Sequence, residues 1–266
     1  MRSRTLSLVS FGLIVICSPY ARMDLCVRAG VEPTGKKVYV CPPCGNDCDK
    51  MTFDKPGVCP ECGMTLVQKS TVKPAASNRM TVAILLFDGV EIIDYSGPWE
   101  IFGAAGFDVH TVATSSRAVK TAFGQRVIPD YTLENCPKTD ILLVPGGGIY
   151  GALNDARVIS WIQSRSQESQ HVMSVCNGAF FLAKAGLLDG LSSTTIRSSL
   201  DRLAKVAPKT KVVRDRRYVD NGKIITTAGL SAGMDGALHL VAKIRGKDIA
   251  RTTASQLEYK WDSESD

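Results

Sequence analysis

The residues around one cysteine, Cys176, form a pattern that is typical of a nucleophile in enzymes. The run Ser174-Val175-Cys176-Asn177-Gly178 places Cys176 between an apolar segment and the start of a helix, with small residues two positions before and after it. A sharp strand-to-helix turn needs such small neighbours and exposes the side chain at its apex. We expect the helix N-terminus to stabilise a thiolate and to lower the pKa of Cys176. A buried cysteine of the core is the alternative.

A glycine-rich loop is predicted to lie beside this cysteine. The apolar run Ile141 to Val144 leads into Pro145-Gly146-Gly147-Gly148. Because ligands of open α/β sheets bind at the carboxyl ends of the strands, the loop and the Cys176 turn are expected at one edge. Gly146 and the amides of Gly147 and Asn177 are therefore candidates for an anion, substrate or oxyanion pocket. An ordinary tight turn is the alternative.

Seven of the nine cysteines precede residue 63, and four of them repeat one pattern. Cys41-Pro-Pro-Cys44-Gly and Cys59-Pro-Glu-Cys62-Gly are separated by fourteen residues, which is close to zinc-ribbon spacing. A two-residue gap lets both thiolates of a pair face one ion, and four sulfurs complete a tetrahedron. We predict that Cys41, Cys44, Cys59 and Cys62 bind zinc.

Two alternatives remain for this module of residues 36–68. A segment this short has too little core to fold without a metal or a disulfide, so two disulfides are possible. Cys48 is a spare thiol that could replace a ligand or pair with Cys26. The module resembles the heavy-metal-binding domain of copper and silver efflux proteins. That family has Met-His where this chain has Pro43-Cys44, which favours an all-thiolate site, although nearby methionines leave a soft ion such as copper open.

The amino-terminal residues 1–22 have the pattern of an export signal. Arg2 and Arg4 precede an apolar run from Leu6 to Cys17, which is shorter than the roughly 18 residues of a spanning helix. We therefore expect a periplasmic or cell-surface location, where disulfides are permitted. A buried first helix or a short anchor is the alternative, and membrane contact is expected only through an uncleaved N-terminus.

The composition indicates a chain that buries a sizeable core. Of 266 residues, 44% are hydrophobic and 22% are charged, which excludes wholesale disorder, collagen and polytopic membrane architectures. The net charge of +6 is too small to indicate nucleic acid. Residues 69–79 lack apolar periodicity and are predicted to be a linker, which leads to a larger domain at 80–250 and a tail at 251–266.

The larger domain alternates short apolar runs with helical segments, which predicts an α/β fold. Continuous apolar strands between helices indicate a parallel-sheet sandwich with helices on both faces. A hairpin is expected around Asn221-Gly222, and Ser231 is the candidate N-cap of a closing helix. The expected strands are 81–87, 107–113, 141–144 and 171–175, and the expected helices are 91–105, 154–168, 177–185 and 231–244.

Four ordered motifs of this domain resemble the ThiJ/PfpI family, and within it they look like the isonitrile hydratase-like branch. The motifs are Leu85 to Pro98, Leu143 to Gly148, Ser174 to Gly178 and Thr226 to Asp235. The resemblance implies a class I glutamine amidotransferase-like fold and a homodimer. It also implies that the elbow cysteine is paired with a carboxylate from the first helix, and the matching position is Asp94.

This pairing is chemically sensible, because a carboxyl beside a thiolate can perform acid–base steps on a covalent intermediate. A helix N-terminal role is the alternative for Asp94. The chain departs from the branch at Asn177, where the branch has Thr, and at Ile196-Arg197, where it has His-Trp. The substrate and the role of Arg197 therefore stay open.

Other features exclude related functions. No histidine lies between Cys176 and His239, so a Cys-His dyad is not expected, and His110, His171 and His239 are predicted to be structural. Regulators of this fold carry a helix-turn-helix domain, for which residues 251–266 are too few. The basic stretch 202–217 is predicted to be solvated.

These observations support an exported, cysteine-dependent hydratase or hydrolase of a small electrophile, with an isonitrile as the example that the family suggests. Cys176 is the predicted nucleophile and Asp94 the predicted acid and base. The alternative is a non-enzymatic metal-binding or redox-stress protein in which Cys176 is an oxidisable sensor.

Overall fold

A computed structural model describes residues 37–41, 48, 51–61, 63–69 and 79–262. The chain divides into two compact units, Met1–Ala75 and Ala76–Asp266. The boundary between these two ranges falls within the predicted linker. The predicted export signal at 1–22 and most of the linker lie outside the described residues. In the part of the chain that is described, no helix combines the length and apolar character that a membrane span requires.

The smaller unit contains a three-stranded antiparallel sheet in the order β2-β1-β3. Its strands are β1 (Tyr39–Val40), β2 (Thr52–Phe53) and β3 (Val67–Gln68). Among the described residues of this unit, the buried cluster consists of Cys41, Cys48, Cys59 and Leu66, and Val40 of β1 is also buried. Within this described part, cysteine sulfur thus makes up more of the buried cluster than aliphatic side chains do.

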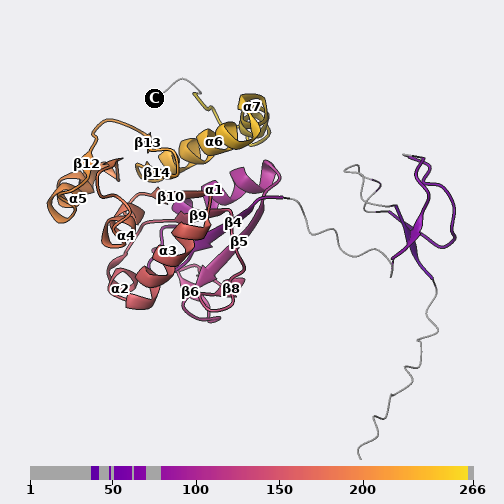
Figure 1. The fold of residues 1–266 in the computed structure, drawn as a ribbon, viewed down its shortest axis with the longest axis horizontal. Coiled ribbons are helices and arrows are strands. Elements are labelled where there is room, and N and C mark those ends of the chain that lie inside the picture. Colours follow the sequence, from indigo (N-terminus) through magenta and orange to yellow (C-terminus); the bar gives the residue numbers. More distant parts are fainter. Residues whose placement is uncertain (1–36, 42–47, 49–50, 62, 70–78, 263–266) are drawn as a thin grey trace, which may run out of the picture. The chain divides into compact units, whose positions relative to one another are not determined.

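The larger unit is built on a seven-stranded sheet in the order β13-β14-β10-β9-β4-β5-β8 (Figure 1). All neighbouring pairs are parallel except β13 and β14, which form the expected hairpin. The strands are β4 (Thr81–Leu85), β5 (Asp108–Ala113), β8 (Tyr131–Thr132), β9 (Ile141–Val144), β10 (His171–Val175), β13 (Tyr218–Asp220) and β14 (Ile224–Thr227). The prediction of a mainly parallel sheet is confirmed.

Two shorter sheets and two groups of helices complete this unit. One group comprises α1, α6 and α7, and the other comprises α2, α3, α4 and α5 (Figure 1). The helices are α1 (Ile92–Ala104), α2 (Tyr150–Leu153), α3 (Ala156–Glu168), α4 (Gly178–Lys184), α5 (Leu200–Val206), α6 (Ser231–Arg245) and α7 (Lys247–Gln256). The short sheets pair β6 (Val119–Lys120) with β7 (Arg126–Val127) and β11 (Ser192–Ser193) with β12 (Lys211–Val212).

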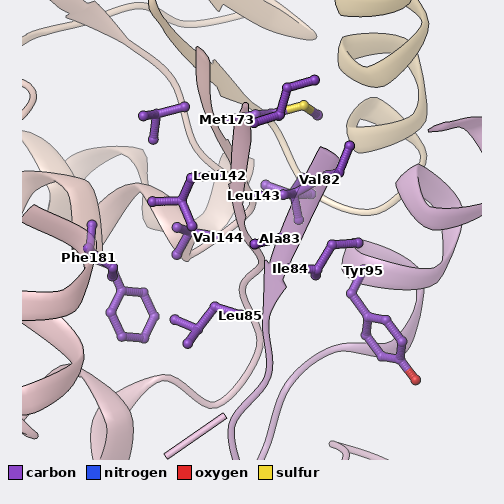
Figure 2. Packing of buried hydrophobic residues seen from close by; sticks show 14 of the residues in the cluster. Val82, Ala83, Ile84, Leu85, Tyr95, Leu142, Leu143, Val144, Met173 and Phe181 are labelled. Carbon is purple, nitrogen blue, oxygen red and sulfur yellow. The ribbon is translucent and has the colours of Figure 1, made fainter. Parts of the chain in front are cut away.

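The core lies along the three central strands. In β4, β9 and β10, Val82–Leu85, Ile141–Val144 and Val172–Val175 are buried throughout, as expected for strands that are covered on both faces. Figure 2 shows Val82–Leu85 of β4, Leu142–Val144 of β9 and Met173 of β10 together with Phe181 of α4 and Tyr95 of α1. Each fully buried aliphatic side chain contributes about 1.5–3 kcal/mol, so these strands form a rigid base for the loops at their carboxyl ends.

Two local expectations differ from the structure. Leu230 rather than Ser231 occupies the N-cap of α6, and the Ser231 hydroxyl instead accepts a hydrogen bond from Arg217. α7 runs past residue 250, where the sequence analysis ended the domain, and it buries Ala250 and Ala254 in the core. The first part of the predicted tail is therefore a packed helix.

Candidate active site and thiol cluster

Cys176 lies at a strained turn between β10 and α4. Its backbone φ is 57°, in the left-handed region that costs a non-glycine residue about 1–3 kcal/mol. The turn is held on both sides, because the Cys176 amide donates to Ala228 O at 3.1 Å and the Thr195 hydroxyl donates to Cys176 O at 2.6 Å. The predicted strand-to-helix elbow is therefore present.

Small residues around the elbow are a steric requirement. A Cβ added to Gly178 would collide with the carbonyl oxygen of Val144. One added to Gly146 would lie 2.5 Å from the amide nitrogen of Asn177 and 2.8 Å from the Cβ of Cys176. These contacts explain why the glycine loop and the Cys176 turn can lie against each other.

Asp94 reaches the elbow from the first turn of α1. Its side chain is fully buried, and its carboxylate accepts hydrogen bonds from the amides of Leu230 at 2.9 Å and Gly146 at 3.2 Å. It also shares a hydrogen bond with the thiol of Cys176. Asp94 is thus not a helix cap, since the N-cap of α1 is Glu91.

The helices α1 and α6 pack closely enough to bring Asp94 and Leu230 together. A Cβ on Gly97 would lie 2.8 Å from Cγ of Met234, so a larger residue at this crossing would displace the Met234 side chain. Leu230, the residue before α6, has a φ of 57°. In this conformation its amide donates to the Asp94 carboxylate. Two strained residues, Cys176 and Leu230, therefore face one acid, a pattern typical of functional sites.

Burial raises the pKa of the Asp94 carboxyl to about 6. The hydrogen bonds from Leu230, the Cys176 thiol and Gly146 oppose this effect, because they favour the carboxylate. A carboxyl with a pKa near the working pH can both accept and return a proton. The acid–base role of Asp94 stays a prediction, and a pKa of about 6 is compatible with it.

The pKa of Cys176 is raised to about 12, in contrast to the lowered value expected from sequence. Burial is the largest cause, and the negative charge of Asp94 is the second. The amides of Asn177 and Gly147 donate hydrogen bonds to the thiol and lower its pKa, but by less. α4 has seven residues, so its N-terminus cannot outweigh the loss of water around a side chain that is 4% exposed.

Cys176 and Asp94 form a coupled pair. Between pH about 6 and about 12 the two groups together hold one proton and one negative charge. Moving that proton from sulfur to the carboxylate creates a thiolate beside a carboxylic acid without changing the net charge. Such a transfer would supply the nucleophile that the sequence predicts at Cys176.

The glycine loop contributes to the site in two different ways. The amides of Gly147 and Asn177 donate hydrogen bonds to the Cys176 thiol, and the anion pocket itself stays a prediction. The Gly146 amide instead donates to Asp94, so we correct its assignment from a substrate-binding group to one that orients the carboxylate. Asn177 is fixed by its side chain, whose amide donates to Gly147 O at 3.2 Å.

Three neighbouring residues were not identified from the sequence. Thr195 and Leu230 lie within or next to motifs, but their bonds to Cys176 and Asp94 depend on how distant segments pack. Arg202 of α5 donates to Oδ1 of Asn177 at 3.4 Å, and no pattern around residue 202 signals this contact. Arg197 forms an exposed ion pair with Asp215 at 3.3 Å.

The three histidines make contacts elsewhere. Nε2 of His110 lies 3.7 Å from the Cys136 sulfur, and Nε2 of His239 lies 2.8 Å from Asp220. His171 begins β10, at the opposite end of the strand from Cys176. This arrangement agrees with the expectation that Cys176 is not part of a Cys-His dyad.

The smaller unit brings Cys41, Cys48 and Cys59 together. Their sulfur atoms all lie within 4.8 Å of one another, and those of Cys41 and Cys48 are 4.0 Å apart. Sulfurs at about 2.3 Å from a tetrahedral zinc are separated by about 3.8 Å, so the cluster fits thiolate coordination of a metal. Cys44 and Cys62, which the sequence also predicted as ligands, lie outside the described residues.

Cys48 lies beside two of the predicted ligands, although the sequence analysis did not include it among the four. The spacing left it as a spare thiol, but it is 2% exposed and faces Cys41 and Cys59. Near Cys59, Gly63 has a φ of 74°, which favours glycine, and its amide donates to Cys59 O at 2.9 Å.

Comparison with known proteins matches both units. Residues 80–243 match the DJ-1/PfpI family, and residues 38–69 match the heavy metal binding domain. Isonitrile hydratase of Pseudomonas putida is 34% identical over 185 residues, which cover 68% of this chain and 78% of that protein. Protein dj-1beta of Drosophila melanogaster is 28% identical and is covered over 94% of its length.

A further relative is a transcriptional regulator. The transcriptional regulator GbdR of Pseudomonas aeruginosa is 25% identical, and this chain spans 53% of its length. Among solved structures, a THiJ/PfpI family protein from Pseudomonas syringae has a TM-score of 0.65 at 31% identity, with 70% of this chain and 77% of that chain covered. The chain therefore belongs to the DJ-1/PfpI family and carries a heavy metal binding domain before the family domain.

Proposed function

We propose that this protein is a cysteine-dependent hydratase or hydrolase of small electrophiles, and that an isonitrile is its first candidate substrate. The observation that carries the proposal is the buried pair of Asp94 and Cys176, which holds one exchangeable proton at a strained elbow. Similarity to isonitrile hydratase supports the choice of substrate class.

The first half of the reaction forms a covalent intermediate. The Cys176 sulfur adds to the terminal carbon of the isonitrile while the thiol proton passes to the Asp94 carboxylate. Asp94 then returns that proton to the same carbon, which gives a thioimidate with a new C–S and a new C–H bond. The amides of Gly147 and Asn177 stabilise the negative charge on sulfur during its attack.

The second half consumes one water molecule. Asp94 accepts a proton from water as the water oxygen adds to the thioimidate carbon, and it transfers this proton to the substrate nitrogen. The C–S bond then breaks, the proton of the new hydroxyl returns to sulfur, and an N-substituted formamide leaves. The sum of the two halves is the addition of water to the isonitrile.

Incubation of the full chain with methyl or benzyl isonitrile tests this function, with formamide followed by mass spectrometry. We expect catalytic turnover by the wild type and no turnover above background by Cys176→Ala. A matched Cys136→Ala variant, which changes a buried cysteine away from the elbow, should keep full activity. Equal turnover by wild type and Cys176→Ala would contradict the mechanism.

The sensor alternative receives less support from the site. Oxidation of cysteine follows thiolate character and exposure, whereas Cys176 has a raised pKa and is 4% exposed. Rapid formation of a sulfinate in dilute peroxide, without turnover of isonitriles, nitriles or carbonyl compounds, would reverse this preference.

For the smaller unit we propose a zinc site that contains Cys41, Cys48 and Cys59, with Cys44 and Cys62 as candidates for the remaining position. A closed thiolate site of this kind stabilises a fold and performs no chemistry on substrate. Copper is the alternative, because sulfur ligands also select Cu(I). Elemental analysis of the purified full chain under reducing conditions distinguishes the two metals.

We also propose export of the chain through residues 1–22 and assembly as a homodimer. The pattern of the N-terminal residues supports export, and the family domain supports the dimer. Cell fractionation with sequencing of the mature N-terminus tests the first proposal, and sedimentation of the purified protein tests the second.

A further inference from the structure

A groove of about 270 Å³ lies between α2, α4 and α5. Its lining is mainly apolar, and it comprises Ile149, Tyr150, Leu153, Phe180, Ala183, Lys184, Arg202 and Val206. Ile149 and Phe180 are buried, whereas Tyr150 is 65% and Val206 59% exposed. Two large apolar side chains thus stay in contact with solvent beside a preformed hollow, which is a common mark of a binding site.

The groove is connected to the catalytic pair through one side chain. Arg202, which lines the groove, donates to Oδ1 of Asn177 at 3.4 Å and to the Tyr150 hydroxyl at 2.7 Å. Its guanidinium also lies over the ring of Phe180, 4.3 Å from the ring centre. Asn177 in turn donates its backbone amide to the Cys176 thiol, so the wall of the groove is two contacts from the sulfur.

The charges of the groove restrict what it can bind. Its lining includes two cations, Lys184 and Arg202, and no acidic residue, so a cationic group is disfavoured. Lys184 is engaged by Leu153 O at 2.9 Å, and Arg202 by the contacts described above. The remaining surface consists of rings and aliphatic groups, which suit an uncharged apolar group. A volume at the lower end of ligand pockets limits that group to about one ring.

We propose that this groove binds the apolar substituent of the substrate, an uncharged group of about the size of one aromatic ring, while the reactive carbon faces Cys176. This inference rests on the proposed function and adds a substrate class to it: electrophiles that carry one compact hydrophobic group. Arg202 then separates the groove from the space around the Cys176 thiol, and its hydrogen bond holds the Asn177 side chain in place.

Alkylation of Cys176 tests the groove independently of turnover. The probes are iodoacetamide and N-benzyliodoacetamide, applied to the full chain at pH 8, with labelling of Cys176 measured by mass spectrometry. Relative to a free thiol, the wild type should prefer the benzyl reagent by about tenfold or more, the discrimination that an apolar pocket gives. Leu153→Trp should fill the groove and remove this preference while the iodoacetamide rate stays unchanged.

Two further variants keep the test decisive. Val206→Asp places a charge at the exposed rim, where folding is little affected, and should also reduce the preference. Ile128→Trp, at an exposed position outside the groove, should leave it intact. A wild type without preference, or a preference that survives both groove variants, would overturn the inference.

A different occupant would also show in these experiments. If Leu153→Trp or Val206→Asp dissociated an oligomer in sedimentation, a second copy would cover the groove and the inference would be wrong. If benzyl selectivity were present but no isonitrile were hydrated, the groove assignment would stand and the proposed reaction would fail.

Discussion

The two units bury cysteine sulfur in opposite ways. In the larger unit, Cys176 is surrounded by a carboxylate and two amides, and it is one sulfur within a large core of aliphatic and aromatic side chains. Among the described residues of the smaller unit, Cys41, Cys48 and Cys59 make up most of the buried cluster. A single thiol beside an acid can exchange a proton with it, whereas several thiols beside one another can hold a metal ion or form a disulfide. The residues around each sulfur, and not its burial, therefore distinguish the two proposed roles of cysteine in this chain.

The largest effect is expected from removal of the proposed nucleophile in the larger unit. Cys176→Ala should reduce turnover by at least about 10⁴-fold, because the nucleophile is lost, while bound metal stays at the wild-type level. Kinetics and elemental analysis of the same preparation measure both quantities. A variant that lost its metal along with its activity would show that the two units are not independent.

The next largest effect concerns Asp94. Asp94→Asn should reduce turnover by about 10²–10⁴-fold, since the acid–base group is removed. Loss of the negative charge should at the same time lower the pKa of Cys176 and accelerate its alkylation at pH 9. Asp88→Asn, at an exposed position shortly before α1, is the matched control and should change neither rate. Parallel loss of turnover and of alkylation would indicate a structural role for Asp94.

Cys48→Ser tests the proposed metal site of the smaller unit. Because this thiol faces Cys41 and Cys59, its replacement should weaken metal binding by about tenfold or more and leave turnover unchanged. Competition with a chromogenic chelator measures the affinity, and Cys136→Ser provides a buried cysteine outside the cluster. Unchanged affinity would return Cys48 to the role of a spare thiol.

The pH profile sharpens the account of the catalytic pair. Asp94 must be ionised to accept the thiol proton, and burial raises its pKa to about 6. The rate at low substrate should therefore be small below this pH, rise as the pH increases through about 6 and then stay level in mildly alkaline solution. A rise near pH 8 or 9 instead would assign control of the rate to an ordinary thiol.

The smallest effect is expected from the loss of one hydrogen bond to the backbone of the turn at Cys176. Thr195→Val removes the hydroxyl that donates to Cys176 O and should lower the free energy of unfolding by about 1 kcal/mol. Denaturant titration measures this change against Thr252→Val, an exposed control on α7. No difference between the two variants would show that β10 and α4 hold the turn without this bond.

Features that depend on neighbouring residues could be predicted from the sequence. The apolar strands, the hairpin at Asn221-Gly222 and the small residues around Cys176 each follow from local periodicity or sterics, and the structure contains all of them. The family resemblance added Asp94, whose position beside the thiol has no local signal.

Features that depend on distant packing could not be predicted. The raised pKa of Cys176 results from burial by segments far apart in the chain, so the expected effect of the helix N-terminus was too large. The left-handed Leu230 and the contact between Arg202 and Asn177 arise only when α6 and α5 are in place. Cys48 was ambiguous for the same reason, because spacing shows which thiols are near in sequence and not which of them meet.

Titration of the Cys176 thiolate by its ultraviolet absorbance, in the wild type and in Asp94→Asn, tests the shared proton most directly. We expect no thiolate signal from Cys176 at pH 7 in the wild type, and a titration at clearly lower pH once the carboxylate is gone. Cys176→Ala supplies the baseline for the remaining cysteines. A wild-type thiolate already present at pH 7, or a titration that is the same in Asp94→Asn, would contradict this expectation.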